Sequence, residues 1–375
     1  MAVDSPVDPG GLAEFSVVFT GRALNHMSRN FQQVMRDISG LLKSVYRAEA
    51  VAVVPGGGSY GMEAIARQFA HGRKVLVLRN GWFSYRWSQI FEIGQIPAQE
   101  IVLKAQPVSD AAQAPFAPPR IDDVEAAIAR DKPDLVFAAH VETASGIMLP
   151  DGYLDRVARA VRAHGGLFVL DCVASGAIWV DMQARGVDVL LSAPQKAWSA
   201  PPSSALVMLG ARAVERLEHT QSSSFAADLR KWRQIMQAYE NGGHAYHATM
   251  PTDALRSFRD AAQETVQLGL AHLRERQQTL GQRVRALLAE YGYPSVAAPG
   301  FEAPGVVVSY TSDPDIASAK RFVEIGIQAA AGVPLMCDES TGFRTFRIGL
   351  FGLDKFADVD ATVERLARGL RGLKG

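Results

Sequence analysis

Short apolar runs alternate with helical patterns along the first half of the chain, and this alternation limits the possible folds more than any other feature. The runs are 51–54, 74–78, 100–103, 134–139 and 167–170, and helical patterns include 30–46, 121–129 and 154–163. Strands that are apolar throughout are buried on both faces. The alternation therefore predicts an α/β fold with a parallel sheet that helices cover on both sides.

From about residue 256 the pattern changes, which indicates a second unit. One long helical pattern runs from 256 to 289, followed by predicted strands at 305–310 and 345–348 and predicted helices at 316–326 and 356–373. The Ala-rich stretch 328–332 is expected to be a turn or a helix end. We therefore predict an N-terminal arm (1–20), a large domain (21–255) and a smaller C-terminal α+β domain (256–375), which the long helix joins to the large domain.

Composition excludes several classes of function. Lys+Arg and Asp+Glu both number 39, so a net charge of zero gives no field to attract nucleic acid or anionic membrane. Two cysteines, Cys172 and Cys337, predict neither a disulfide framework nor a metal site. No secretory signal is recognisable at residues 1–11 and no apolar run is long enough to span a membrane, so we expect a cytoplasmic protein.

Lys196 lies in an unusual place for a lysine. It follows a predicted buried strand at 188–192 and precedes the Pro201-Pro202 pair. A lysine is usually a solvated surface residue, but an amine desolvated at the mouth of a strand can act as a nucleophile. Such an amine suits a Schiff base with pyridoxal phosphate, a cofactor that also needs a phosphate cradle, an acid at its ring nitrogen and a stacking surface.

The sequence offers a candidate for each need. Gly57, Gly58 and Ser59 stand between a strand and a helix, where backbone N–H groups bind anions. The same turn could simply begin a helix, but it has neither the spacing of a dinucleotide loop nor the lysine of a Walker loop.

Asp171 ends an apolar strand and would pair with a protonated ring nitrogen. It could instead be a structural carboxylate that caps the next helix. Phe83 is the candidate stacking surface, with Trp82 and His140 as competitors, although aromatic residues mostly fill cores.

Taken in order, these residues resemble the class V aminotransferases of fold type I, nearest to the alanine–glyoxylate and serine–pyruvate aminotransferase branch. The resemblance covers about residue 25 to the end. It rests on the segments 55–64, 140–146, 171–175, 195–196 with 200–202, 246–251 and 347–349. It implies a large domain with a mostly parallel, seven-stranded sheet covered by helices, and a smaller α+β domain.

The resemblance also implies roles for individual residues. Lys196 would be the Schiff-base lysine and would move the proton, and Asp171 would pair with the ring nitrogen. Arg347 would bind the substrate carboxylate. Other residues would bind the cofactor: Thr143 at the ring oxygen, Val173 and Phe83 on the two ring faces, and Gly57, Gly58, Ser59 and Gln195 at the phosphate, with Tyr246 and Thr249 reaching the phosphate of the neighbouring subunit in a homodimer.

Two positions depart from the family pattern. Residues 19–26 replace a Gly-Pro-Gly-Pro-like segment that lines the substrate pocket in relatives, and Ser203 replaces the usual glycine after the Pro-Pro pair. Arg22 and His26, in the altered segment, could recognise a second polar group of the substrate or lie at the surface.

We therefore expect a transaminase that uses a small, alanine- or serine-like amino acid and a 2-oxo acid such as glyoxylate or pyruvate, by a ping-pong mechanism. The alternative is a lyase of the same fold, such as a cysteine desulfurase with Cys337 as nucleophile, or another reaction at Cα or Cβ. A nicotinamide oxidoreductase is disfavoured because the dinucleotide motif is missing. A non-catalytic binding protein would leave Lys196 and Asp171 together unexplained.

Overall fold

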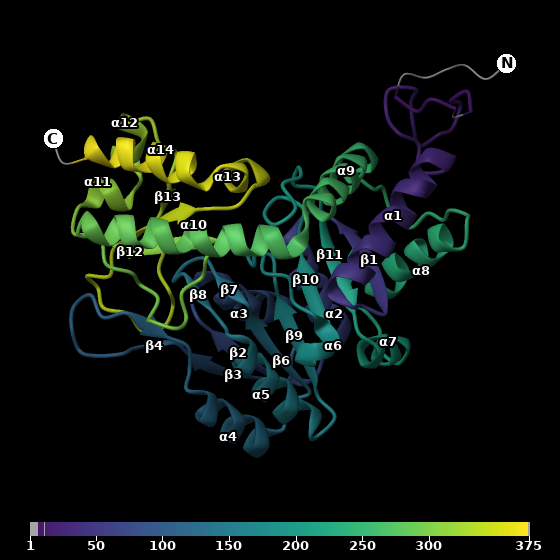
Figure 1. The fold of residues 1–375 in the computed structure, drawn as a ribbon. Coiled ribbons are helices and arrows are strands. Elements are labelled where there is room, and N and C mark those ends of the chain that lie inside the picture. The colour runs from purple at the N-terminus through teal and green to yellow at the C-terminus, as the bar shows by residue number, and fades with distance from the viewer. Residues whose placement is uncertain (1–6, 11, 374–375) are drawn as a thin grey trace.

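The computed structural model describes residues 7–10 and 12–373, so residues 1–6 and Gly11 of the predicted arm (1–20) lie outside the described residues, as do 374–375. A seven-stranded sheet forms its centre, in the order β1-β11-β10-β9-β6-β2-β3 (Figure 1). Strand β11 runs antiparallel to both neighbours and the other strand pairs are parallel. The strands are β1 (Ala50–Pro55), β2 (Lys74–Arg79), β3 (Gln99–Lys104), β6 (Leu135–Ala139), β9 (Leu167–Asp171), β10 (Val189–Ser192) and β11 (Ser204–Leu209).

Helices cover this sheet, and its central strands β6, β9 and β10 are buried at every residue. Burial on both faces explains why these strands are apolar runs without polar alternation. The helices of this part of the chain are α1 (Arg29–Tyr46), α2 (Gly58–Phe69), α3 (Trp82–Gly94), α4 (Ile121–Asp131), α5 (Asp151–Arg162), α6 (Met182–Arg185), α7 (Ala211–Glu218), α8 (Leu229–Glu240) and α9 (Thr252–Leu268).

A smaller antiparallel sheet, in the order β12-β14-β13, lies beside helix α10 (Leu270–Glu290). Figure 1 shows α10 lying between the large sheet and the C-terminal helices, and Leu280, Phe322 and Phe346 share one buried core there. The elements are β12 (Val306–Tyr310), β13 (Ala330–Ala331), β14 (Thr345–Gly349), α11 (Pro314–Ala317), α12 (Lys320–Glu324), α13 (Leu353–Ala357) and α14 (Val359–Arg371). Two small hairpins complete the chain, β4 (Gln106–Pro107) with β5 (Phe116–Ala117) and β7 (Val141–Glu142) with β8 (Ile147–Met148).

Three predicted long helices were wrong because each is divided. The pattern at 256–289 is two helices, and Gly269, at φ +92°, separates α9 from α10. Ala319, at φ +65°, separates α11 from α12, and Asp358 interrupts the last helix and caps α14. A residue with a left-handed or extended backbone ends the helical ladder even where side-chain periodicity continues across it.

Other differences concern short or central elements. The stretch 328–332 holds the edge strand β13, not a helix end, and Ala330 pairs with Arg347. Strand β11 and helices α7 and α8 were not predicted from the sequence. The predicted boundary at 255/256 falls inside α9 and stays a prediction. Within the described residues, no helix has both the length and the apolar character needed to cross a bilayer.

Candidate functional site

The candidate site begins at the carboxyl ends of β9 and β10, which are adjacent parallel strands. Asp171 is the last residue of β9 and is paired in register with Leu191 of β10. Beyond Ser192, β10 continues into the loop that carries Lys196. Parallel neighbours end at the same edge of a sheet, where open α/β folds bind their ligands.

Asp171 is buried at the end of β9. Its Oδ1 accepts a hydrogen bond of 2.9 Å from the Val173 backbone N–H, and no ion pair to it is present within residues 7–10 and 12–373. Burial raises the pKa of Asp171 to about 6, although the backbone N–H bond opposes this rise. A cation at this carboxylate would offset the burial, so the site suits a protonated ring nitrogen.

Lys196 is partly buried, and burial together with the nearby Arg347 charge lowers its pKa, against an opposing effect of Asp171. Its Nζ lies 5.1 Å from the centre of the Phe351 ring. A lowered pKa increases the neutral, nucleophilic fraction of the amine. Lys196 is therefore within electrostatic reach of both Asp171 and Arg347, although the three residues come from separate parts of the chain.

The loop after Lys196 is held at two points. The Trp198 side chain is fully buried against Trp179, with ring centres 4.6 Å apart. Ser199 has a left-handed backbone, at φ +53°, and its Oγ accepts a 2.9 Å bond from the Leu353 backbone N–H. The loop is thereby tied to the first turn of α13, close to Phe351.

The predicted phosphate residues lie at the N-terminus of α2. Gly58 packs directly on Val173, because a Cβ added at Gly58 would lie only 2.9 Å from Val173 Cγ2. This position therefore requires glycine, and the contact joins the predicted phosphate and ring residues. Ser59 is exposed, and its Oγ accepts a 2.8 Å bond from Arg86. Gln195 is exposed in the lysine loop.

Phe83, at the start of α3, lies between two arginines. Its ring centre is 5.2 Å from Arg86 Cζ and 5.7 Å from Arg347 Cζ. Arg347 Nε also donates to the Ala331 carbonyl at 2.8 Å, which fixes the guanidinium beside β13. The predicted stacking residue and the predicted carboxylate-binding residue are therefore neighbours.

Glu142 is fully buried and organises this part of the site. Its carboxylate accepts bonds from the backbone N–H groups of Phe83 (3.2 Å), Ser84 (2.8 Å) and Ala144 (3.0 Å). A carboxylate at a helix N-terminus satisfies donors that have no intrahelical partner. Glu142 therefore fixes Phe83 and lies next to the buried Thr143.

The competitors for the ring face have other partners. His140 Nδ1 lies 2.7 Å from Ser175 Oγ, and burial lowers the pKa of this imidazole to about 4. Its backbone N–H donates to the Asp171 carbonyl at 2.9 Å, so His140 supports the end of β9. Trp82 packs on Tyr85, with ring centres 5.7 Å apart.

Tyr246 and Thr249 form a separate group. Their hydroxyls lie 3.3 Å apart in an exposed position, and the Tyr246 ring lies 5.6 Å from the His26 ring. His26 is buried with a lowered pKa, chiefly through burial and then through His244, and Arg22 is exposed. The structure thus brings the altered N-terminal segment to Tyr246.

Cys337 does not have the properties of a mobile nucleophile. The thiol is buried and donates to the Arg79 carbonyl at 3.3 Å, and burial raises its pKa to about 12. A thiol acts as a nucleophile through its thiolate, so these surroundings disfavour the desulfurase alternative.

The residues present fit pyridoxal phosphate. A buried aspartate with a raised pKa, a lysine with a lowered pKa and a glycine-lined helix start occur together. The family model "Aminotransferase class-V" matches residues 16–348. The chain belongs to this family.

Relatives agree with this assignment. Alanine–glyoxylate aminotransferase from Oryctolagus cuniculus is 27% identical over 360 residues, covering 93% of this chain and 86% of the relative. The 2-aminoethylphosphonate–pyruvate transaminase from Burkholderia ambifaria is 28% identical, covering 92% and 88%. The crystal structure of alanine–glyoxylate aminotransferase from Nostoc sp. superposes with a TM-score of 0.79 at 24% identity, covering 93% and 89%.

Membership of the class-V aminotransferases makes this protein a transaminase of fold type I with pyridoxal phosphate as its cofactor. Within the described part of the chain, no group of three His, Cys, Asp or Glu residues is arranged to hold a metal ion.

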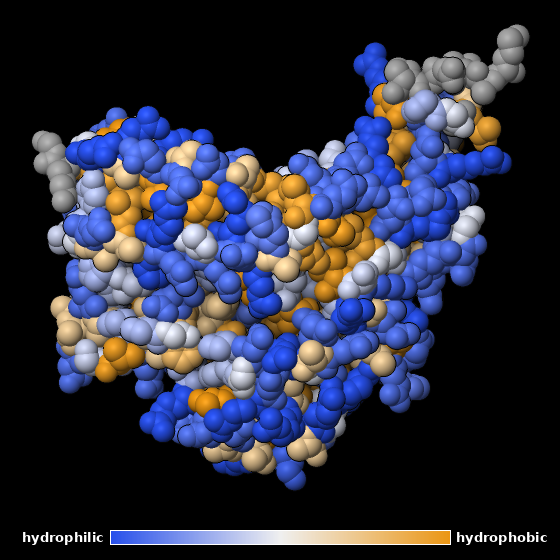
Figure 2. All heavy atoms as spheres, viewed as in Figure 1, coloured by the Kyte–Doolittle hydropathy of each residue, from blue (hydrophilic) through white to orange (hydrophobic). Residues whose placement is uncertain are grey.

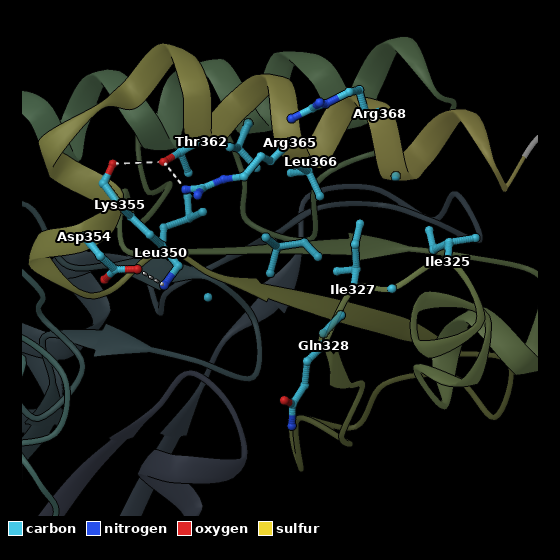
Figure 3. A pocket seen from close by; sticks show the side chains of 16 residues that line it. Ile325, Ile327, Gln328, Leu350, Asp354, Lys355, Thr362, Arg365, Leu366 and Arg368 are labelled. Carbon is cyan, nitrogen blue, oxygen red and sulfur yellow. Dashed lines mark hydrogen bonds and ion pairs between the residues drawn. The ribbon is translucent and has the colours of Figure 1, made fainter.

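A cavity of about 740 Å³ lies elsewhere, between α14 and the small sheet (Figure 3). Ile325 and Ile327 line it together with Lys355 and Arg365, and its lining includes none of the predicted cofactor or substrate residues. Ile348 lines the cavity, whereas its neighbour Arg347 does not, as expected for adjacent strand residues that point to opposite faces.

Four further residues lie at this site that were not predicted from the sequence: Arg86, Glu142, Ser199 and Phe351. Arg86 could have been found from its helical spacing, since it follows Phe83 by three positions. Glu142 lies inside a segment that carried the family resemblance, but its role depends on α3 packing against it. No sequence signal indicated Ser199 or Phe351, because their contacts join distant segments.

Proposed function

We propose that this class-V transaminase moves an amino group between a small, alanine- or serine-like amino acid and a 2-oxo acid such as glyoxylate or pyruvate, by a ping-pong mechanism. The observation that carries the proposal is that Lys196 lies within electrostatic reach of both Asp171, at the end of β9, and Arg347, in β14. The names of the two relatives, which act with glyoxylate and pyruvate, support the choice of oxo acid.

Lys196 is the proposed Schiff-base lysine and the group that carries the proton at the reacting carbon. Its lowered pKa keeps part of the amine neutral, as both roles require. Asp171 pairs with the ring nitrogen, which gives the buried carboxylate its countercharge. Pyridoxal phosphate, when bound, supplies the electron sink for amino-group transfer. Gly57, Gly58, Ser59 and Gln195 hold its phosphate, and Thr143, Val173 and Phe83 surround its ring.

Arg347 binds the substrate carboxylate in a bidentate pair, for which a planar guanidinium is well suited. Its Nε is already held by the Ala331 carbonyl, so the two terminal nitrogens are available to the carboxylate. Phe83 stands beside Arg347, and Phe351 stands beside Lys196. Aromatic rings next to both groups restrict the space for a substrate side chain, which favours small amino acids.

We also propose a cytoplasmic homodimer in which Tyr246 and Thr249 complete the phosphate site of the partner subunit. Tyr246 is 56% exposed, and Phe15 of the N-terminal segment is 94% exposed. Figure 2 shows hydrophobic residues on the part of the chain that projects beside α1. Exposed large apolar side chains of this kind indicate an interface.

Subunit complementation tests the dimer. The variants Lys196→Ala and Tyr246→Ala are each expected to have little activity as separate proteins. After co-refolding, a hybrid dimer contains one site with both Lys196 and Tyr246 intact, so activity should return. If mixtures stay as inactive as the two separate variants, Tyr246 does not serve the partner's site.

Steady-state kinetics test the reaction itself. With L-alanine or L-serine as donor and glyoxylate or pyruvate as acceptor, a ping-pong enzyme gives parallel lines in double-reciprocal plots at different acceptor concentrations. Intersecting lines would exclude the ping-pong mechanism. Turnover of none of these donors would exclude the proposed substrates while leaving the family assignment intact.

A further inference from the structure

Arg86 is a cation beside the proposed phosphate subsite. It lies one turn into α3, and its Nη1 donates a 2.8 Å bond to Ser59 Oγ at the N-terminus of α2. Its Cζ lies 5.2 Å from the centre of the Phe83 ring. Across residues 7–10 and 12–373, no carboxylate lies within ion-pair distance of Arg86.

This guanidinium lies beside the N-terminus of α2, a place that favours an anion. The N-terminus of a helix carries a partial positive charge from its free N–H groups, so a cation is normally disfavoured there. Arg86 nevertheless donates to the exposed hydroxyl of the second residue of α2. A phosphate between the guanidinium and the helix would be attracted by both.

The residues proposed for the phosphate lack a charged side chain. Gly57 and Gly58 offer backbone N–H groups, and Ser59, Gln195, Tyr246 and Thr249 offer neutral polar groups. A phosphate monoester carries nearly two negative charges at neutral pH. The other residues proposed for the phosphate therefore cannot balance this charge with a positive side chain. Arg86 is the cation that could do so.

We propose that Arg86 binds the phosphate of pyridoxal phosphate and is the main cation of that subsite. The inference rests on the cofactor site proposed above and adds a residue to it. On binding, the Ser59 hydroxyl turns from accepting the Arg86 N–H to donating to a phosphate oxygen. The guanidinium stays against Phe83, so one side chain links the phosphate subsite to the ring face.

Two other roles for Arg86 predict different changes in the affinities for pyridoxal phosphate and pyridoxal. Its charge lowers the pKa of Asp171, and its contact with Phe83 could fix the stacking surface. Both of these effects act at the ring of the cofactor. Pyridoxal has the same ring and aldehyde but no phosphate, so it separates the roles. An effect at the ring changes the affinity for both compounds, whereas a contact with the phosphate changes only the affinity for pyridoxal phosphate.

The experiment measures the binding of pyridoxal phosphate and of pyridoxal to the apoprotein by absorbance titration. Arg86→Gln should weaken pyridoxal phosphate binding about 10- to 100-fold, the range for one charge-assisted contact, and leave pyridoxal binding within about twofold. Inorganic phosphate should compete with pyridoxal phosphate in the wild type more strongly than in Arg86→Gln. Arg86→Lys keeps the charge but not the planar guanidinium. Its affinity for pyridoxal phosphate should lie between those of the wild type and Arg86→Gln.

Arg67→Gln is the matched control. Arg67 is in the last turn of α2 and also donates to a serine hydroxyl, that of Ser223, at 3.3 Å. The Arg67→Gln variant should bind pyridoxal phosphate and pyridoxal with the affinities of the wild type. Thermal unfolding of each apoprotein checks folding, and Arg86→Lys carries the comparison if Arg86→Gln does not fold.

Equal weakening for both compounds, or no weakening of either, would overturn the inference. These outcomes differ from a failure of the proposed function. If the wild type takes up neither compound, the cofactor site itself is misplaced. If the wild type prefers pyridoxal phosphate and Arg86→Gln retains the full preference, the role of Arg86 alone is wrong.

Discussion

The amine of Lys196 lies 5.1 Å from the centre of the Phe351 ring, although the two residues are far apart in sequence. An aromatic face stabilises the charged form of an amine, whereas burial and Arg347 favour the neutral form. Phe351 therefore opposes the lowering of the Lys196 pKa that burial and Arg347 cause.

Phe351→Leu should lower the pKa of Lys196 by about half a pH unit, because a cation–π contact contributes roughly 0.5–1 kcal/mol. The measurement is the pH dependence of the rate at which apoprotein takes up pyridoxal phosphate, which needs the neutral amine. Phe343→Leu removes a ring that packs on Tyr310 instead, and serves as the control. A midpoint that is unchanged, or that moves to higher pH, would contradict the role of the ring.

Substitutions at Ser199 should separate backbone strain from hydrogen bonding. Ser199→Ala loses the bond to the Leu353 N–H and keeps the left-handed backbone, so it should destabilise the protein by about 1–2 kcal/mol. Ser199→Gly loses the same bond but accepts a positive φ without strain, and should be less destabilising. Urea unfolding of the apoproteins gives both values. A glycine variant less stable than the alanine variant would show that strain is unimportant here.

Glu142→Gln should destabilise the protein by about 2–4 kcal/mol, since a buried amide cannot accept all the bonds that this carboxylate accepts. Glu92→Gln changes an exposed carboxylate near the other end of α3 and should stay within about 0.5 kcal/mol of the wild type. Chemical unfolding of both variants checks the difference. Equal stabilities would mean that Glu142 does not hold the start of α3.

The raised pKa of Asp171 predicts that its charged form destabilises the folded apoprotein, and that this destabilisation depends on pH. The folded protein binds the proton of the Asp171 carboxyl group more tightly than the unfolded chain does. The contribution of Asp171 to the free energy of unfolding therefore falls as pH rises from about 4 to about 6. Asp171→Asn removes this destabilisation and should make the apoprotein more stable above pH 6, by at most about 3 kcal/mol, with no gain below pH 4.

Thermal unfolding of wild-type and Asp171→Asn apoproteins across this pH range gives the difference. His140 has a lowered pKa and changes stability in the opposite direction, but it is present in both proteins and cancels in the comparison. A constant difference at all pH values would indicate that Asp171 has an ordinary pKa.

The strands that build the site were predictable from sequence, and so were the residues at their ends. Asp171 and Lys196 are polar groups that follow buried apolar strands, and a charged residue in that place needs a partner. Residue type and local position single out both residues as candidates, and their roles at the cofactor stay predictions.

The remaining contacts arise from tertiary packing. Glu142 and Arg86 act through α3, and Phe351 acts from the segment after β14, so their partners are distant in sequence. The division at Gly269 was also hidden, because one glycine in a helical pattern costs only about 1 kcal/mol and does not by itself mark an end. The short strand β13 is defined by its pairing with β14 and not by its composition.

The half-reaction tests the central claim most directly. Holoenzyme mixed with one amino acid at a time, without an oxo acid, should lose the visible absorption band of the lysine-bound cofactor and gain that of the pyridoxamine form. L-Alanine should release about one pyruvate per active site, and added glyoxylate should restore the band. Lys196→Ala should not complete this cycle. If no amino acid bleaches the wild-type band, or if Lys196→Ala turns over as the wild type does, the proposed transamination at Lys196 is wrong.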